Sequence, residues 1–213
     1  MNRVAKYFFE SSMNIFSTLD VADALEGTDV SKYGLIKRAI KNGEILNIRR
    51  GLYCLAPKFQ KNVVSVYGLA EKIYGPSYIS LESALSYHGW IPEAVYSCTS
   101  VCFDTSKEFN TPLGVYSYQR VPQDVLYLDV QRYEDANGNV IFMASPVKAL
   151  IDYVYIHKVQ WNMISDVFES LRIEYEHLND IDIPTLEELK DNYSNKRVKK
   201  FISDWLKEVK SEQ

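Results

Sequence analysis

The chain has 213 residues, a net charge of -4, a hydrophobic fraction of 46% and a charged fraction of 24%. This composition excludes an intrinsically disordered chain and is typical of a folded globular protein. We expect a cytoplasmic protein, because the first residues lack a signal-peptide core and every apolar run is too short to cross a bilayer. Three cysteines in such a chain indicate reduced thiols rather than a disulfide framework.

The charge is distributed unevenly along the chain. Residues 31–61 contain eight basic residues and one acidic residue, Glu44, a balance of +7, so the remaining residues carry -11. An asymmetry of this kind attracts one end of a molecule to phosphate and repels the other end. Residues 31–61 are therefore the predicted nucleic-acid contact.

Three helices are predicted before residue 43. Apolar residues at helical spacing indicate a first helix near Val4, and Thr18 is the predicted cap of a second helix that Gly27 ends. After a short turn, Ser31 is the predicted N-cap of a third helix, which runs to about Asn42.

The third helix separates an apolar face from a basic face. At 100° per residue, one side carries Leu35, Ile36, Ala39 and Ile40, and the other carries Gly34, Lys37, Arg38 and Lys41. By itself this pattern also fits a solvated amphipathic helix with an excess of lysine. In a helix-turn-helix, the exposed side of the second helix meets phosphates and base edges in the major groove.

A predicted hairpin follows the basic helix. Residues 44–49 and 52–55 read as two strands joined at Arg50-Gly51, a tight turn that needs the positive φ of glycine. A hairpin in this position is a wing, and arginines at its tip favour the minor groove. The predicted DNA-contacting residues are Lys32, Tyr33, Lys37, Arg38, Lys41, Arg49 and Arg50.

The rest of the chain predicts a second, larger domain of residues 61–213, with a boundary near residue 60. Helices are expected at residues 63–74 and at 81–88, the latter capped by Ser80. Residues 95–143 read as strands of an antiparallel or mixed sheet, with a hairpin turn at Asn137-Gly138. The fold class is α+β, an N-terminal winged helix-turn-helix of residues 1–60 followed by an α/β domain.

The chain is predicted to end in helices. Pro146 behind Ser145 suits the first turn of a helix, and apolar residues at spacings of three and four indicate further helices from Trp161 and from Val198. Between these two, a capping box at Thr185 predicts a short helix.

Motifs for catalysis or metal binding are not found in the sequence. His88, His157 and His177 are scattered, Cys98 and Cys102 share one strand face as packing residues do, and GxSxG, Walker A and GxGxxG patterns do not occur. We predict a protein that is not an enzyme and needs no cofactor. The rival interpretation is a restriction-like nuclease that uses Asp124 or Asp129, but residues 140–143, which should supply the second carboxylate, are apolar.

Several strings together resemble the AbiEi family, the antitoxins of type IV toxin-antitoxin systems linked to abortive phage infection. They span roughly residues 15 to 160: GEILNIRRGLY at 43–53, YISLESALSYHG at 78–89, Ile91-Pro92, TPLG at 111–114 and ASPVKALID at 144–152. The resemblance implies an antitoxin that represses its own operon through the N-terminal domain and counteracts a nucleotidyltransferase-like toxin, AbiEii, through the C-terminal region. It also implies operator DNA with inverted repeats and cooperative or homodimeric binding of two copies. A winged-helix regulator that senses a small molecule and has no toxin partner is the alternative, and the neighbouring gene decides between them.

Overall fold

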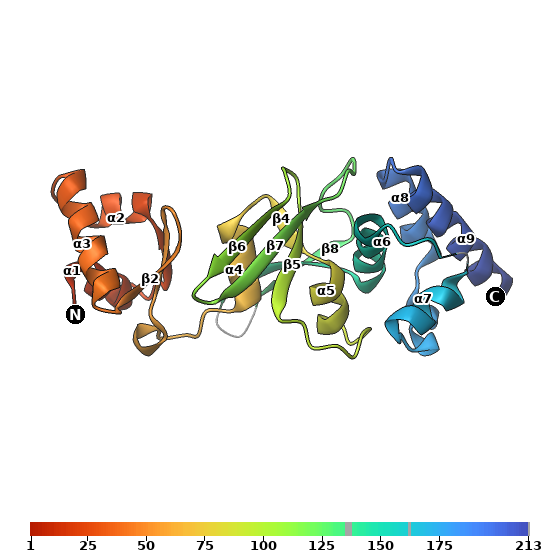
Figure 1. The fold of residues 1–213 in the computed structure, drawn as a ribbon, viewed down its shortest axis with the longest axis horizontal. Helices are drawn as coiled ribbons and strands as arrows, with labels where there is room; N and C mark the ends of the chain where they lie inside the picture. Colours follow the sequence, from red (N-terminus) through yellow and green to blue (C-terminus); the bar gives the residue numbers. More distant parts are fainter. Residues whose placement is uncertain (135–137, 162, 213) are drawn as a thin grey trace.

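The computed structural model describes residues 1–134, 138–161 and 163–212, drawn in Figure 1. Within these residues the chain forms a mixed α/β fold with nine α-helices, a three-stranded antiparallel sheet and a six-stranded mixed sheet. Figure 1 shows the N-terminal elements at one end, the larger sheet in the middle and the last three helices at the other end. In the described part of the chain, no helix is long and apolar enough to cross a membrane.

The N-terminal elements occupy residues 3–55. In chain order they are α1 (Arg3–Glu10), β1 (Ile15–Ser17), α2 (Thr18–Ala24), α3 (Asp29–Lys41), β2 (Ile45–Arg49) and β3 (Leu52–Leu55). Strand β3 is central and pairs antiparallel with both β1 and β2.

Two helix caps differ from those expected from the sequence. Ser17, not Thr18, caps α2, and its hydroxyl accepts a hydrogen bond from the backbone N–H of Asp20. Thr28, not Ser31, caps α3, so the short turn expected between the second and third helices forms the cap and first turn of α3. The predictions were wrong because closely spaced hydroxyl residues all suit an N-cap, and local sequence does not choose among them.

One face of the β2–β3 hairpin packs on α1, α2 and α3. Ile45, Tyr53 and Leu55 point to this side and join a hydrophobic cluster with Phe8 and Phe16. The rings of Phe8 and Phe16 are stacked with their centroids 3.8 Å apart. This cluster is the core of the N-terminal end of the molecule.

The other face of the same hairpin packs on the rest of the protein. Because successive strand residues point to opposite faces, Ile48, Leu52 and Cys54 face away from α3 and join the larger hydrophobic cluster. All four residues of β3 are consequently buried. The hairpin therefore contributes to both cores.

The larger part of the molecule is built around the six-stranded sheet. After a 3₁₀ turn (Pro57–Phe59), its elements are α4 (Val66–Ile73), β4 (Ser77–Ile79), α5 (Leu81–Tyr87), β5 (Ser97–Cys102), β6 (Lys107–Thr111), β7 (Gly114–Arg120), β8 (Val130–Glu134), β9 (Val140–Ala144), α6 (Pro146–His157), α7 (Ile164–Leu171), a 3₁₀ segment (Tyr175–Asp180), α8 (Ile183–Asn192) and α9 (Lys196–Glu212). The strand order is β6-β7-β5-β4-β9-β8, with parallel pairs β5/β7 and β4/β9. The expected mixed sheet is confirmed.

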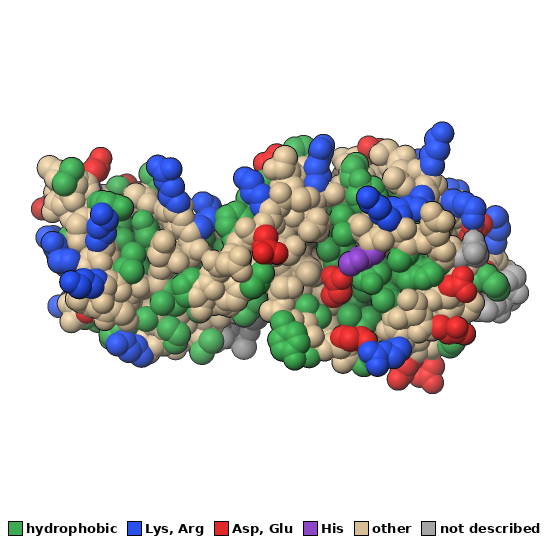
Figure 2. All heavy atoms as spheres, in the orientation of Figure 1, with side chains coloured by type: hydrophobic (Ala, Val, Ile, Leu, Met, Phe, Trp, Pro, Cys, Tyr) green, Lys and Arg blue, Asp and Glu red, His purple; other side chains and the backbone are tan. Residues whose placement is uncertain are grey.

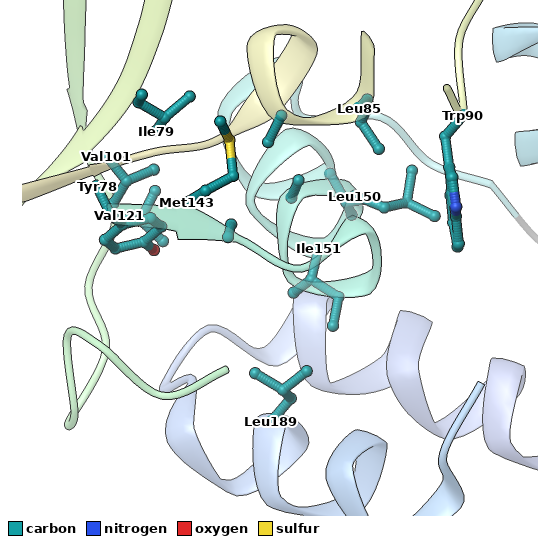
Figure 3. Close-up of a cluster of buried hydrophobic side chains, with 14 of the residues drawn as sticks. Tyr78, Ile79, Leu85, Trp90, Val101, Val121, Met143, Leu150, Ile151 and Leu189 are labelled. Atoms are coloured by element: carbon teal, nitrogen blue, oxygen red, sulfur yellow. The ribbon is translucent and has the colours of Figure 1, made fainter. Parts of the chain in front are cut away.

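Helices α4 and α6 reach opposite faces of this sheet. Tyr78 pairs with Val101, and Val101 pairs in turn with Gln119 of β7. Tyr118 is the residue next to Gln119, so its side chain points to the opposite face of the sheet. The Tyr118 hydroxyl donates to the carbonyl of Ala70 in α4 at 2.5 Å, and the Tyr78 hydroxyl donates to Asp152 in α6 at 2.8 Å. Figure 3 shows the apolar core in which side chains of the sheet, α5, α6 and α8 meet.

The expected elements of this region occur with shifted boundaries. β8 and β9 pair antiparallel as expected, β8 starts at Val130, and Asn137 of the predicted turn lies outside the described residues. Ser145 caps α6 ahead of Pro146, as predicted. α7 starts at Ile164 rather than Trp161, and Asp182, not Thr185, caps α8.

The three cysteines are expected to resist alkylation in the folded protein. All are buried, and burial raises the pKa of Cys54 and Cys98 to about 12, so the nucleophilic thiolate is scarce near neutral pH. Mass spectrometry after iodoacetamide treatment should find no adduct on the native chain and three adducts in concentrated urea. Rapid labelling of the native chain would contradict the buried packing role.

Candidate nucleic-acid interface

A groove lies between α3 and the β2–β3 hairpin. It encloses a cavity of about 670 Å³ lined by Thr18, Tyr33, Ile36, Lys37, Ile40, Asn47, Arg50, Gly51 and Tyr53. Ile36 and Tyr53 are buried and form an apolar floor, whereas Tyr33, Lys37 and Arg50 are exposed at the rim. The cavity thus brings together three of the seven predicted DNA-contacting residues, one of them from the hairpin.

Local contacts hold the rim in place. The Lys37 ammonium lies 4.6 Å from the centroid of the Tyr33 ring, a cation–π contact between successive turns of α3. At the hairpin tip, Gly51 has φ of +80°, as the predicted turn requires. The Gly51 carbonyl accepts a hydrogen bond from the backbone N–H of Thr18 at 3.0 Å, which fixes the tip beside the start of α2.

Arg38 and Lys41 are exposed on α3 but do not line the groove. They extend the basic surface along the helix toward its C-terminal end. Figure 2 shows Lys and Arg side chains gathered at the end of the molecule that the N-terminal elements form.

Lys32 and Arg49 make internal contacts. The Lys32 ammonium donates to the carbonyl of Ala22 at 2.7 Å and thereby links α3 to α2. The Arg49 guanidinium donates to the carbonyl of Lys72 in α4 at 3.4 Å and so points toward the larger part of the molecule. The pairing of β2 with β3 shifts register between Asn47 and Arg49, at the residue whose side chain points this way. The structure therefore does not bring these two cations to the groove.

Glu44, the one acid of the basic segment, is turned inward. It is 8% exposed, and its carboxylate accepts a hydrogen bond from the backbone N–H of Asn2 at 2.8 Å. Its negative charge is consequently withdrawn from the surface that carries the lysines and arginines.

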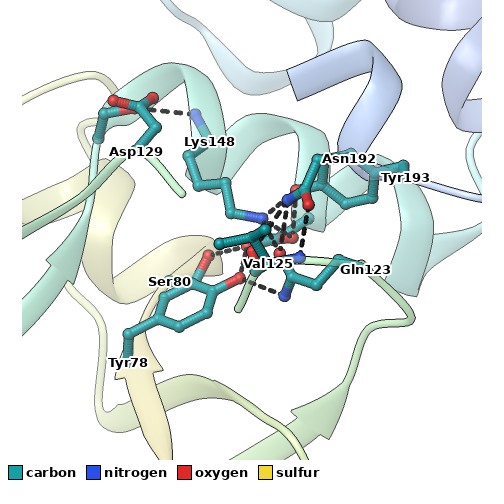
Figure 4. Close-up of polar contacts among 10 residues, drawn as sticks. Tyr78, Ser80, Gln123, Val125, Asp129, Lys148, Asn192 and Tyr193 are labelled. Carbon is teal, nitrogen blue, oxygen red and sulfur yellow. Dashed lines mark hydrogen bonds and ion pairs between the residues drawn. The ribbon is translucent and has the colours of Figure 1, made fainter. Parts of the chain in front are cut away.

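A buried polar network in the larger part of the molecule was not foreseen from the sequence. Lys148 and Asp152 are both fully buried on α6, with the ammonium 3.3 Å from Oδ1 of the carboxylate. Figure 4 shows how the surrounding residues converge on this pair. Tyr78 and Ser80 each donate a hydroxyl hydrogen bond of 2.8 Å to Oδ2 of Asp152.

Further partners of the pair come from distant elements. The Tyr193 hydroxyl donates to Oδ1 of Asp152 at 2.7 Å, and Oε1 of Gln123 accepts from the Lys148 ammonium at 2.5 Å. Burial lowers the pKa of Lys148, while the charge of Asp152 opposes that shift. Burial raises the pKa of Tyr193 well above its ordinary value, so its hydroxyl stays a neutral donor. Tyr78, Ser80, Lys148, Asp152 and Tyr193 are buried, Gln123 is half-buried, and the network connects β4, α6 and the α8–α9 junction.

Ser80 has a different role from the predicted one. No cap hydrogen bond is made by its side chain, although the residue does precede α5, and its hydroxyl bonds Asp152 instead. The partner is 72 residues away in the chain, which local sequence could not indicate.

The residues considered for nuclease chemistry are dispersed. Asp129 accepts a hydrogen bond from the Ser145 hydroxyl, and burial raises the pKa of its carboxyl. Asp124 is exposed, and β9 is apolar between β4 and β8. Across residues 1–134, 138–161 and 163–212, no three His, Cys, Asp or Glu side chains gather as they would to hold a metal ion.

The chain was also compared with known proteins. No protein-family model matches it, and no curated protein matches it either.

Proposed function

We propose that the protein is a DNA-binding regulator in which residues 1–60 act as a winged helix-turn-helix. The order helix, strand, two helices, two strands supports this assignment, with α3 as the recognition helix and β2–β3 as the wing. The observation that carries the proposal is the groove that places Lys37 of α3 and Arg50 of the hairpin tip on one rim. An α-helix fits the major groove of DNA, and an arginine beside it reaches the backbone or the adjacent minor groove.

We further propose that this regulator is the antitoxin of a type IV toxin-antitoxin system and counteracts a nucleotidyltransferase-like toxin through residues 61–213. The support is the resemblance of its strings to the AbiEi family. Two of these strings supply Tyr78, Ser80, Lys148 and Asp152, so the resemblance falls on residues that hold the larger sheet and α6 together. Two copies would bind inverted repeats cooperatively in the cytoplasm.

The groove is tested by the double variant Lys37→Ala with Arg50→Ala, probed on the DNA that precedes the protein's own gene. Affinity should fall at least roughly tenfold, because the variant removes two cations that would contact phosphates, and such contacts supply much of the affinity for DNA. The slope of log affinity against log salt concentration should become shallower by about 1.8, because each lost phosphate contact contributes about 0.9. Fluorescence anisotropy over a salt series measures both quantities.

A matched control removes the same charge from the same basic segment. Lys58→Ala with Lys61→Ala also deletes two exposed cations, but neither lines the groove. If the control loses as much affinity as the groove variant, net charge rather than the groove explains binding, and the docking mode is wrong.

The antitoxin role has its own experiment. The groove variant, co-expressed with a nucleotidyltransferase encoded by the adjacent gene, should lose repression of the operon and still rescue growth. Loss of rescue together with repression would place neutralisation in the N-terminal region. An adjacent gene of another class would favour the regulator without a toxin.

A further inference from the structure

A basic trough lies at the far side of the larger region, away from α3. Two cavities, of about 890 and 450 Å³, share Gln160, Lys196 and Arg197 and so form one continuous depression. The end of β7, the C-terminal end of α6 and the start of α9 surround it. We call it the basic trough and define it by Arg120, Lys158, Gln160, Trp161, Lys196, Arg197 and Lys200.

The trough concentrates positive charge in an otherwise acidic part of the chain. Five of the seven defining residues are cations, and no acidic residue lines either cavity. Among the described residues, Lys200 is the one member with an ion pair, to Asp204 at 2.8 Å. Arg197 donates to the carbonyl of Tyr155 at 2.9 Å, which positions its guanidinium beside α6. Figure 2 shows Lys and Arg side chains over the C-terminal helices on the face in view.

Aromatic and amide groups accompany the cations. Trp161 is half-buried and lies parallel to the Tyr153 ring, with centroids 6.1 Å apart, so the indole is held in a fixed plane. Gln119, Gln160 and Asn195 line the first cavity. Oδ1 of Asn195 accepts from the backbone N–H groups of Arg197 and Val198, so the amides of Gln119 and Gln160 are the ones that can meet a base. Cations that follow a phosphate backbone, with an aromatic ring for stacking, are the common elements of single-strand binding sites.

We propose that the basic trough binds single-stranded nucleic acid. Its cations contact successive phosphates, Trp161 stacks on a base, and the amides face base edges. The aromatic ring favours a single strand, because unpaired bases are free to stack on Trp161, whereas the bases of a duplex are stacked on one another. The site lies outside residues 1–60 and does not rest on the proposed operator binding.

The proposal is tested with the full chain and fluorescein-labelled oligo(U) and oligo(dT) of about 12 nucleotides, within the site sizes of known single-strand binders. Anisotropy at low salt should show binding that an unlabelled duplex of mixed sequence displaces poorly. Lys158→Ala with Lys196→Ala should weaken binding at least roughly tenfold and reduce the salt slope by about 1.4, because each phosphate contact to a single strand contributes about 0.7. Trp161→Ala should weaken it roughly fivefold or more, whereas Trp161→Phe should retain it.

Two control variants distinguish the trough from the other charged surfaces of the molecule. Lys207→Ala with Lys210→Ala removes two cations from the same helix outside the trough and should leave binding unchanged. The variant Lys37→Ala with Arg50→Ala should also bind single strands as the unmodified chain does. The proposal is overturned if neither oligonucleotide binds, if either control loses as much affinity as the trough variant, or if polyglutamate binds the trough and the oligonucleotides do not.

Discussion

Replacing Lys148 with methionine is expected to lower the free energy of unfolding by about 3–5 kcal/mol, the cost of leaving one charge of a buried pair without its partner. Methionine has a similar length but cannot donate a hydrogen bond, so the carboxylate of Asp152 would stay buried without a cation. Urea unfolding followed by tryptophan fluorescence measures the loss, because Trp90 and Trp205 are buried in the same hydrophobic cluster.

The matched control is Lys158→Met, just beyond the end of the same helix. Lys158 is exposed, so this change should alter stability by less than about 0.5 kcal/mol. The double variant Lys148→Met with Asp152→Leu should recover only part of the loss, because the hydroxyls of Tyr78 and Tyr193 would lose their acceptor. A loss below about 1 kcal/mol for Lys148→Met would show that the pair is not important for folding.

Replacing Phe16 with alanine is expected to unfold α1, β1, α2 and α3 selectively, because β2 and β3 are also held by the larger core. Phe16 is 1% exposed and stacks on Phe8, and truncation of a buried phenylalanine costs about 3–5 kcal/mol. A hydrophobic core this small stabilises the folded state only marginally, so a loss of this size is enough to unfold it. Hydrogen exchange measured by mass spectrometry should show loss of protection in peptides from α1 to α3, and the proposed DNA binding should disappear with it.

Tryptophan fluorescence gives the comparison for this variant, because all three tryptophans follow residue 60. The urea midpoint of the Phe16→Ala variant, followed by tryptophan fluorescence, should remain near that of the unmodified chain. Leu19→Ala, at a 75% exposed position, should change neither this midpoint nor the hydrogen exchange. If fluorescence and exchange report unfolding together, the two parts fold as one unit and the predicted boundary near residue 60 is wrong.

Local periodicity predicted the helix that forms the candidate interface. Ile36 and Ala39 are buried and Lys37, Arg38 and Lys41 are exposed, as a period of 3.6 residues requires. The direction of the Arg49 side chain could not be predicted, because its acceptor, the carbonyl of Lys72, belongs to α4. Contacts between elements that are distant in the chain decide such side-chain directions, and local patterns in a single sequence do not reveal these contacts.

The buried network and the basic trough also depend on distant contacts. Lys148 and Asp152 are charged residues of α6, yet the side of the helix that carries them packs against other elements, and both side chains are fully buried. Arg120, Lys158 and Lys196 come from three separate segments with no shared motif. Only the fold brings them together.

The hairpin whose two sides belong to different cores has a mechanical consequence. If one half of the molecule rotated about residues 56–65, apolar side chains of β2 and β3 would lose their contacts with one of the two hydrophobic clusters. Apolar contacts on both faces of the hairpin therefore fix the N-terminal elements against the larger part of the molecule. In the proposed complex with an operator, the larger part would project from the duplex in one fixed direction. The number of base pairs between two repeats would then set the angle between two bound copies, and this angle would decide whether their larger parts touch.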